Sequence, residues 1–251
     1  MTDITPPRRI APQTGPHLWT GAALSPADWM LPLGAEIGAE IEAVLQAPGQ
    51  PMPRLDPLLG QIKERLAHGQ GFCLLRGLPL PDEPNVLLGL LGSRIGRAVH
   101  APPSGGPVYT EPCDALLLLC RETTEATLWS AAALHNALLR ADRAALEVLY
   151  RPLPTGGVPL PVFAVEGGIF AARLDREALD PAAAGGALAA LDEATSAPDL
   201  PLRLTLHPGD LLCVNPFLVW AGTAPGLATL PLLTEPSRLE SAFAPLRPVE
   251  R

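Results

Sequence analysis

Apolar side chains recur at three- to four-residue intervals in some stretches of the chain, and in others they alternate with polar residues or run together. The first spacing predicts helices with one buried face, and the second predicts strands. Predicted helices cover residues 34–45, 55–68, 86–95, 130–150 and 181–195. Predicted strands cover residues 72–76, 115–120, 162–165, 169–172, 202–206 and 211–214. The run at 115–120 is uniformly apolar, which is typical of a strand buried on both faces.

Local signals support several of these boundaries. Asp56 followed by Pro57 is a typical helix start, because Asp caps free amide groups and Pro fits the first helical position. The Gly pair at 167–168 predicts the turn of a hairpin between the strands on either side of it. We expect a break in the 130–150 helix near residues 141–142.

The length and composition favour one large domain. The chain has 251 residues, a net charge of −8, 31 Pro and 23 Gly, which is enough for a substantial core with many turns. It lacks the basic stripe of a nucleic-acid-binding protein, an apolar run of about 20 residues for a membrane span, and the apolar segment of a signal peptide. We therefore expect a cytoplasmic protein with a single domain at 16–236, a flexible Pro-rich segment at 1–15 and a peripheral tail at 237–251.

The four cysteines, Cys73, Cys113, Cys120 and Cys213, are scattered and include no Cys-x-x-Cys pair. This spacing argues against a disulfide framework or a zinc site. It favours buried, reduced thiols.

Several segments, in this order, resemble the TauD/TfdA branch of the iron- and 2-oxoglutarate-dependent oxygenases. They are GPHLWTGAALSPADWML, HGQGFCLLRGLPL, PCDALLLLC, LHNALLRADRAALEVLYRPLP, PVFAVEGGIFAARLD and LHPGDLLCVNPFLVWAG, and they span about residues 15 to 235. The second is close to the family's Gly-x-Gly-Phe-x-x-Leu-Arg-Gly strand. The resemblance implies an α+β, mainly β fold: a double-stranded β-helix, or jelly roll, of two packed sheets with bracing helices.

The family's metal site is altered in this sequence. Family members hold Fe(II) with a His-x-Asp segment and a later His, which leaves positions open for the oxo-acid and O₂. The resemblance places Tyr109 and Ala221 at the two His positions and Glu111 at the Asp position. Glu keeps a carboxylate, whereas a neutral phenol is a poor Fe(II) ligand and a methyl group is none.

The cosubstrate end is altered as well. The family presents an Arg to the 2-oxoglutarate carboxylate soon after the second His, but residues 223–231 contain neither Arg nor Lys. The two-pronged clamp that Arg forms with a carboxylate is therefore missing from that segment. We expect none of the histidines to rebuild the metal site; they are His17, His68, His100, His135 and His207.

Tyr109 and Glu111 are the best surviving polar pair. Two positions apart on an extended segment, their side chains point to one face. They either form a hydrogen-bonded pair that plugs an unused cavity or act as a ligand-binding or acid/base pair in a reused pocket. The remaining residues expected to line this pocket are Cys113, Trp129, Asn215, Ala221 and Thr223. No base is adjacent to Cys113 in the sequence, which argues against a nucleophilic thiol.

From the sequence we favour a pseudoenzyme: an oxygenase homologue that has lost Fe(II)/2-oxoglutarate chemistry, needs no cofactor, and serves as a small-molecule- or partner-binding scaffold in a biosynthetic pathway. Two alternatives remain. One is an active Fe(II)/2-oxoglutarate-dependent oxidoreductase that hydroxylates a small molecule with atypical ligands. The other is a metal-independent acid/base enzyme in the old pocket. The expected partner is a small molecule, and neither nucleic acid nor membrane is expected.

Overall fold

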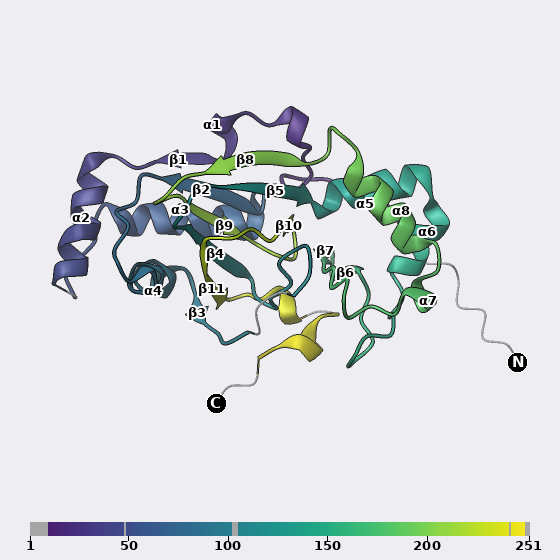
Figure 1. Cartoon of the computed structure of the whole chain (residues 1–251). Coiled ribbons are helices and arrows are strands. Elements are labelled where there is room, and N and C mark those ends of the chain that lie inside the picture. The colour runs from purple at the N-terminus through teal and green to yellow at the C-terminus, as the bar shows by residue number, and fades with distance from the viewer. Residues whose placement is uncertain (1–9, 48, 102–104, 241, 249–251) are drawn as a thin grey trace, which may run out of the picture.

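The computed structural model describes residues 10–47, 49–101, 105–240 and 242–248, and within these residues the strands form three sheets (Figure 1). The six-stranded sheet has the order β1 (Met30–Pro32), β2 (Phe72–Arg76), β9 (Leu211–Val214), β4 (Ala115–Cys120), β11 (Leu227–Leu233), β3 (Arg97–Ala98). The three-stranded sheet has the order β10 (Val219–Ala221), β5 (Thr124–Ser130), β8 (Leu202–Leu206). A hairpin of β6 (Phe163–Glu166) and β7 (Ile169–Ala172) forms the third sheet. Strands β1 and β2 are parallel, and the other pairs are antiparallel.

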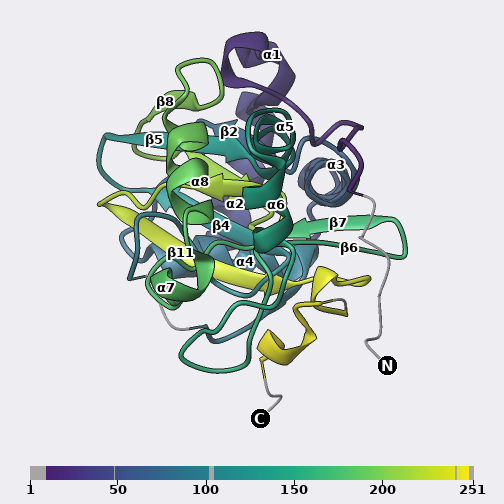
Figure 2. The same ribbon diagram turned by 90° about the vertical axis from the view of Figure 1, so that its right-hand side faces the viewer.

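The helices lie in two groups (Figures 1 and 2). One face of the six-stranded sheet is covered by α2 (Ala35–Gln46), α3 (Leu55–His68) and α4 (Pro84–Ile95). At the opposite end of the molecule lie α5 (Ala131–Ala141), α6 (Arg143–Leu149), α7 (Pro181–Ala184) and α8 (Ala187–Ser196). The short helix α1 (Pro26–Trp29) precedes β1, and single turns of 3₁₀ helix are η1 (Gly21–Ala23), η2 (Arg238–Glu240) and η3 (Ala244–Leu246). Among the described residues, no helix is long and apolar enough to cross a membrane.

Strand β4 shows why the core has two layers. Its six residues are all fully buried. Leu116 and Leu118 face the core between the two sheets, whereas Leu117 and Leu119 face the core beneath α3 and α4. This confirms the prediction of a strand buried on both faces, because successive side chains of a strand point to opposite faces. The mainly β architecture of packed sheets and bracing helices is likewise confirmed.

The predicted break in the 130–150 helix is real. Helix α5 ends at Ala141, and α6 begins at Arg143. Asp142 lies between them, and its Oδ1 accepts a hydrogen bond from the backbone N–H of Ala145 at 2.9 Å. A side chain that caps the new helix N-terminus favours a restart over continuation.

Strands β1, β3, β5, β10 and β11 were not predicted. Strand β10 has three residues, which is too short to produce a pattern. Strand β11 contains Pro231, which pairs with Leu116 of β4, and a Pro inside an apolar run normally argues against a strand. Strand β5 alternates exposed or partly exposed side chains with buried ones from Glu125 to Ser130, but the apolar Trp129 on the more exposed face and the polar Ser130 on the buried face break the pattern in the sequence.

The two terminal stretches each contain buried residues. Residues 1–9 lie outside the described part of the chain; Ile10 is buried, and Gln13 is hydrogen-bonded to α5. After residue 236, Leu239 and Phe243 are fully buried, and Phe243 packs on the ring of Phe217. Both stretches therefore pack against the rest of the described chain.

Candidate functional site

The candidate site is built on a short antiparallel pairing outside the named strands. Val108 forms a bridge with Gly222, and the backbone N–H of Tyr109 donates to the carbonyl of Ala221 at 2.9 Å. Cross-strand neighbours share a face of a sheet, and Ala221 in turn pairs with Leu128 of β5. Tyr109, Ala221 and Leu128 therefore form a row across three adjacent segments, and the two positions aligned with the family's histidines lie side by side.

The side chain of Tyr109 is half-buried beside the main core. Burial raises its pKa, a hydrogen bond from the backbone N–H of Ala224 lowers it, and the negative charge of Glu111 raises it; the net shift is upward. The phenol therefore stays protonated at neutral pH. A protonated phenol can exchange a proton with a substrate, but it is a poor ligand for Fe(II).

Glu111 is 6% exposed, and its carboxylate lies close enough to Tyr109 and Cys113 to act on both. Burial, and next the charge of Glu111, raise the pKa of the Cys113 thiol well above its usual value. A thiol that is fully buried and protonated is not an activated nucleophile. The polar groups of the site are therefore a carboxylate and, near it, a phenol and a thiol.

Arg173 was missed by sequence reasoning, although it contacts the centre of the predicted segment. It follows β7, and its Nε and Nη2 donate to the carbonyl oxygen of Thr110 at 3.2 and 3.0 Å. The same Nη2 forms an ion pair with Asp175 at 2.9 Å. The guanidinium thus fixes the peptide that joins Tyr109 to Glu111. The only sequence signal was a cation directly after the predicted hairpin, 63 residues from Thr110 along the chain.

Thr223 lies at the edge of this pairing. Its backbone N–H donates to the carbonyl of Pro107 at 3.0 Å, and its Oγ1 donates to the carbonyl of Gly106 at 3.1 Å. These bonds hold the 105–109 segment against the residues that follow β10. Thr223 therefore joins Tyr109, Glu111, Cys113 and Ala221 in one neighbourhood.

Trp129 and Asn215 lie elsewhere. Trp129 pairs with Trp220, one position from the Leu128–Ala221 pair, so its side chain points to the opposite face of the sheet. Its indole N–H donates to the carbonyl of Thr195 in α8 at 3.0 Å. The side chain of Asn215 holds the corner after β9: it donates to the carbonyl of Leu66 at 3.1 Å and accepts from the N–H of Phe217 at 3.0 Å.

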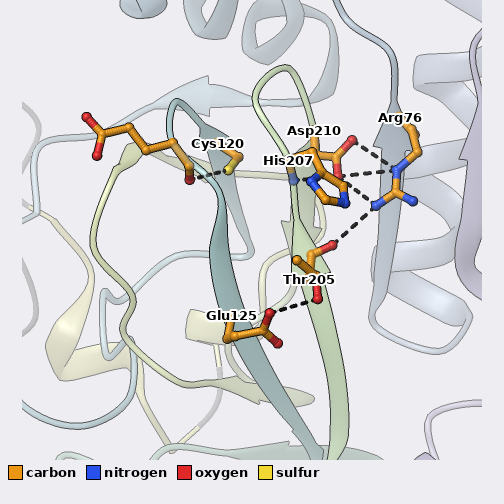
Figure 3. Close-up of polar contacts among 7 residues, drawn as sticks. Arg76, Cys120, Glu125, Thr205, His207 and Asp210 are labelled. Carbon is orange, nitrogen blue, oxygen red and sulfur yellow. Dashed lines mark hydrogen bonds and ion pairs between the residues drawn. The ribbon is translucent and has the colours of Figure 1, made fainter.

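A second polar cluster lies where β2, β8 and β9 meet (Figure 3). The Nη2 of Arg76 donates to the buried carboxylate of Asp210 at 2.8 Å and to the carbonyl of Thr205 at 3.3 Å. Asp210 also accepts from the backbone N–H of His207 at 3.0 Å, and Thr205 Oγ1 donates to Glu125 at 2.7 Å. These contacts bind the turn before β9 to β2, so the Arg of HGQGFCLLRGLPL and the Asp of LHPGD have a structural role.

The aligned residues do not match the family's iron ligands. Two imidazoles and a carboxylate are required for that set, and of the three aligned positions only Glu111 carries a suitable donor. Within the described ranges, no group of three or more His, Cys, Asp or Glu side chains could hold a metal ion. His135 is fully buried among aromatic rings, and His100 and His207 are exposed.

Solved structures of non-heme iron oxygenases share this fold. The asparagine oxygenase AsnO gives a TM-score of 0.64 at 15% identity, over 82% of this chain and 93% of that chain. Its complex with Fe(II), 2S,3S-3-hydroxyasparagine and succinate gives 0.61 at 16% identity, over 82% and 94%. The oxygenase OrfP with Fe and alpha-ketoglutaric acid gives 0.60 at 15% identity, over 82% and 94%. At these identities the likeness establishes the fold. No protein-family profile matches the sequence, and no curated protein matches it significantly.

These neighbours correct two expectations from the sequence. The pseudoenzyme interpretation and the expectation of no cofactor both treated missing histidines as lost chemistry. The neighbours named above are oxygenases, and two of these structures contain Fe(II) and succinate or Fe and alpha-ketoglutaric acid. Two altered side chains do not by themselves demonstrate a loss of activity, so neither expectation stands.

Proposed function

We propose that this chain is an oxidoreductase of the non-heme iron, 2-oxoglutarate-dependent type, which hydroxylates a small molecule and uses an atypical ligand set. The observation that carries the proposal is the convergence of the three aligned positions: Tyr109 and Ala221 are cross-strand neighbours, and the carboxylate of Glu111 lies beside Tyr109. The oxygenases that share the fold support the same assignment.

In this proposal Glu111 is the family carboxylate, lengthened by one methylene. The site would differ from its neighbours because Tyr109 and Ala221 offer no imidazole. Asparagine and arginine are the first substrates to test, since the neighbouring structures contain 3-hydroxyasparagine and L-Arg. We also propose a reducing, cytoplasmic setting, which is supported by four buried cysteines with free thiols.

A second candidate function is metal-independent acid/base catalysis. It is favoured by one observation: a protonated phenol and a carboxylate lie together, and these are the two halves of a proton-transfer pair. Tyr109 would donate a proton to the substrate, and Glu111 would accept one. The segment that carries both residues is held by Arg173.

The two candidates are separated by an anaerobic titration of the protein with Fe(II) in the presence of 2-oxoglutarate. The iron proposal expects a weak visible charge-transfer absorption with near-stoichiometric iron, and its loss in Glu111→Gln. Glu125→Gln is the matched control, because Glu125 is an exposed carboxylate on β5. Succinate release with a small-molecule panel then identifies the substrate.

If wild type and Glu111→Gln give the same titration, the iron proposal is wrong. The acid/base candidate then requires turnover that survives chelation of metals and is abolished in both Glu111→Gln and Tyr109→Phe. If the small-molecule panel shows neither 2-oxoglutarate-dependent turnover nor metal-independent turnover, both candidates are wrong.

A further inference from the structure

Residues 10–19, which we call the N-terminal strap, contact both α5 and the segment just after α3 (Figure 2). Both ends of the strap are buried: Ile10 is 8% exposed and Trp19 is 5% exposed. The indole N–H of Trp19 donates to the carbonyl of Gln70, just after α3, at 2.9 Å. The strap is therefore part of the fold, although it has no helix or strand of its own.

The middle of the strap is held by the side chain of Asn136 in α5. The backbone N–H of Gln13 donates to Asn136 Oδ1 at 2.7 Å, and Asn136 Nδ2 donates back to the carbonyl of Gln13 at 2.9 Å. Asn136 Oδ1 also lies 3.0 Å from Nδ1 of the neighbouring His135. Because Oδ1 is only an acceptor, His135 must carry its proton on Nδ1.

This arrangement fixes the other nitrogen of His135 as well. In the neutral ring with a proton on Nδ1, Nε2 is an acceptor, so the hydroxyl of Tyr150 donates to it at 2.9 Å. Tyr150 is the titratable group that faces His135 from the end of α6, and the rings of Phe163 and Phe170 face it from β6 and β7. His135 is fully buried, and burial lowers its pKa, while its bond to Asn136 raises it; the net shift is downward.

A second histidine, His17, belongs to the strap itself. Its ring stacks on Phe170, with centroids 5.8 Å apart and an interplanar angle of 11°. Its carbonyl accepts from Ser130 Oγ at 2.6 Å, and its Nε2 is buried without a hydrogen-bond partner among the described residues. Burial and then the positive charge of Arg238 lower the pKa of His17. The charge of Arg238 is in turn balanced by Asp114.

We propose that the strap is released by acid: the neutral ring of His17 holds it closed near neutral pH, and protonation of that ring detaches it from Phe170. Protonated His17 places a second cation near Arg238 and charges a buried Nε2 that has no hydrogen-bond partner among the described residues. The change acts on the stack on Phe170, which is one of the strap's two anchors. The other anchor, the Gln13–Asn136 pair, is not sensitive to acid, because a protonated His135 still donates from Nδ1 to Asn136. This proposal is independent of the oxygenase assignment.

The direction of the pH dependence follows from the lowered pKa values. A histidine that stays neutral in the folded protein stabilises it fully above about pH 6.5, the ordinary value in the unfolded chain. This stabilisation is lost as the pH falls below that value towards the lowered pKa of His17, and the equilibrium constant for opening of the strap rises by up to about tenfold per pH unit. The strap should therefore be closed at about pH 7.5 and open at about pH 5.

Hydrogen–deuterium exchange followed by mass spectrometry tests the proposal on the wild-type protein at these two pH values. After correction for intrinsic exchange, the protection factors of peptides within residues 10–19 should be at least about tenfold lower at about pH 5 than at about pH 7.5. The protection factors of peptides from β4 should not change. Equal protection of the strap at both pH values would overturn the proposal. So would a parallel loss in β4, since that reports global unfolding.

Two matched variants assign the effect to a residue. His17→Phe keeps a ring to stack on Phe170 and removes the titrating group, so its strap should lose less protection at the lower pH than that of wild type. His100→Phe, at an exposed position, should behave as wild type. A His17→Phe protein with the pH response of wild type would show that His17 is not an anchor.

Discussion

The Tyr109–Ala221 neighbourhood predicts an energetic coupling between the two positions. Ala221 is 2% exposed and lies between Leu128 and Tyr109 in a row across three segments. An imidazole introduced at 221 therefore has to displace the ring of Tyr109. The single change Ala221→His should cost about 1–3 kcal/mol of unfolding free energy, the usual cost of overpacking.

Tyr109→His alone should cost about 1 kcal/mol, because a half-buried ring loses contacts. In the double variant the smaller ring at 109 makes room for the larger one at 221. The combined cost should therefore be lower than the sum of the single costs by about 1 kcal/mol. Urea denaturation of the four proteins in the presence of a chelator measures this coupling.

The same double variant tests whether Glu111 shares the site. Two imidazoles and the carboxylate of Glu111 complete the family's ligand set. Anaerobic Fe(II) at about 100 times its dissociation constant should then stabilise the double variant by about 2.7 kcal/mol, which raises the melting temperature by about 5–10 °C in a chain of this size.

Additive single costs would refute the reasoning, since they mean that the rings at 109 and 221 do not share one space. If the two substitutions are coupled but Fe(II) does not stabilise the double variant, the carboxylate of Glu111 is too far from positions 109 and 221 to share a metal ion with them. Ala132→His, at a fully buried position in α5, is the control. It should overpack the core without coupling to Tyr109→His.

Two further outcomes follow from the buried polar groups. Asp210→Asn should lower the unfolding free energy by about 2 kcal/mol in urea denaturation; it weakens the pair with Arg76, whose side chain is 38% exposed, so the cost is below the 3–5 kcal/mol of a fully buried pair. An unchanged midpoint and slope would contradict the structural role of this pair. Cys113 should resist iodoacetamide in the folded protein and react in urea, as followed by peptide mass spectrometry, because burial first and the charge of Glu111 next raise its pKa. Rapid alkylation of the folded protein would show that the thiol is accessible.

The fold could be predicted where each element leaves a local signal. The uniformly apolar run of β4 and the Gly pair of the β6–β7 hairpin each specify one kind of element. The predicted start of α3 was slightly wrong, because the helix begins at Leu55 and Asp56 lies inside its first turn rather than at the cap. Strand β10 has no such signal, because its three residues are all buried and are held by pairing with β5 and with the segment at Val108. Tertiary pairing rather than local preference defines that strand.

The sequence predicted which site residues lie close together along the chain, but it did not predict the contacts between distant segments. The spacing of Tyr109 and Glu111 indicated a shared face, and the resemblance to an oxygenase family pointed to Ala221. Arg173 could not be found in this way, because its contact with Thr110 depends on how the β6–β7 hairpin folds back over the sheet. The side chain of Trp129 points to the opposite face of the sheet from its neighbour Leu128, and this face could not be assigned from the sequence because β5 was not predicted.

The replacement of two aligned histidines by Tyr109 and Ala221 is a change of packing as well as of chemistry. A larger ring stands opposite a smaller methyl, so the row stays filled, and packing alone explains both residues. Glu111 differs from these two residues, because its buried side chain, which is 6% exposed, carries a carboxylate. Its charge also raises the pKa of the phenol and the thiol beside it, which favours their neutral forms. Glu111→Gln keeps the shape of this side chain and removes its charge, so it is the substitution that separates the chemistry of the site from its packing.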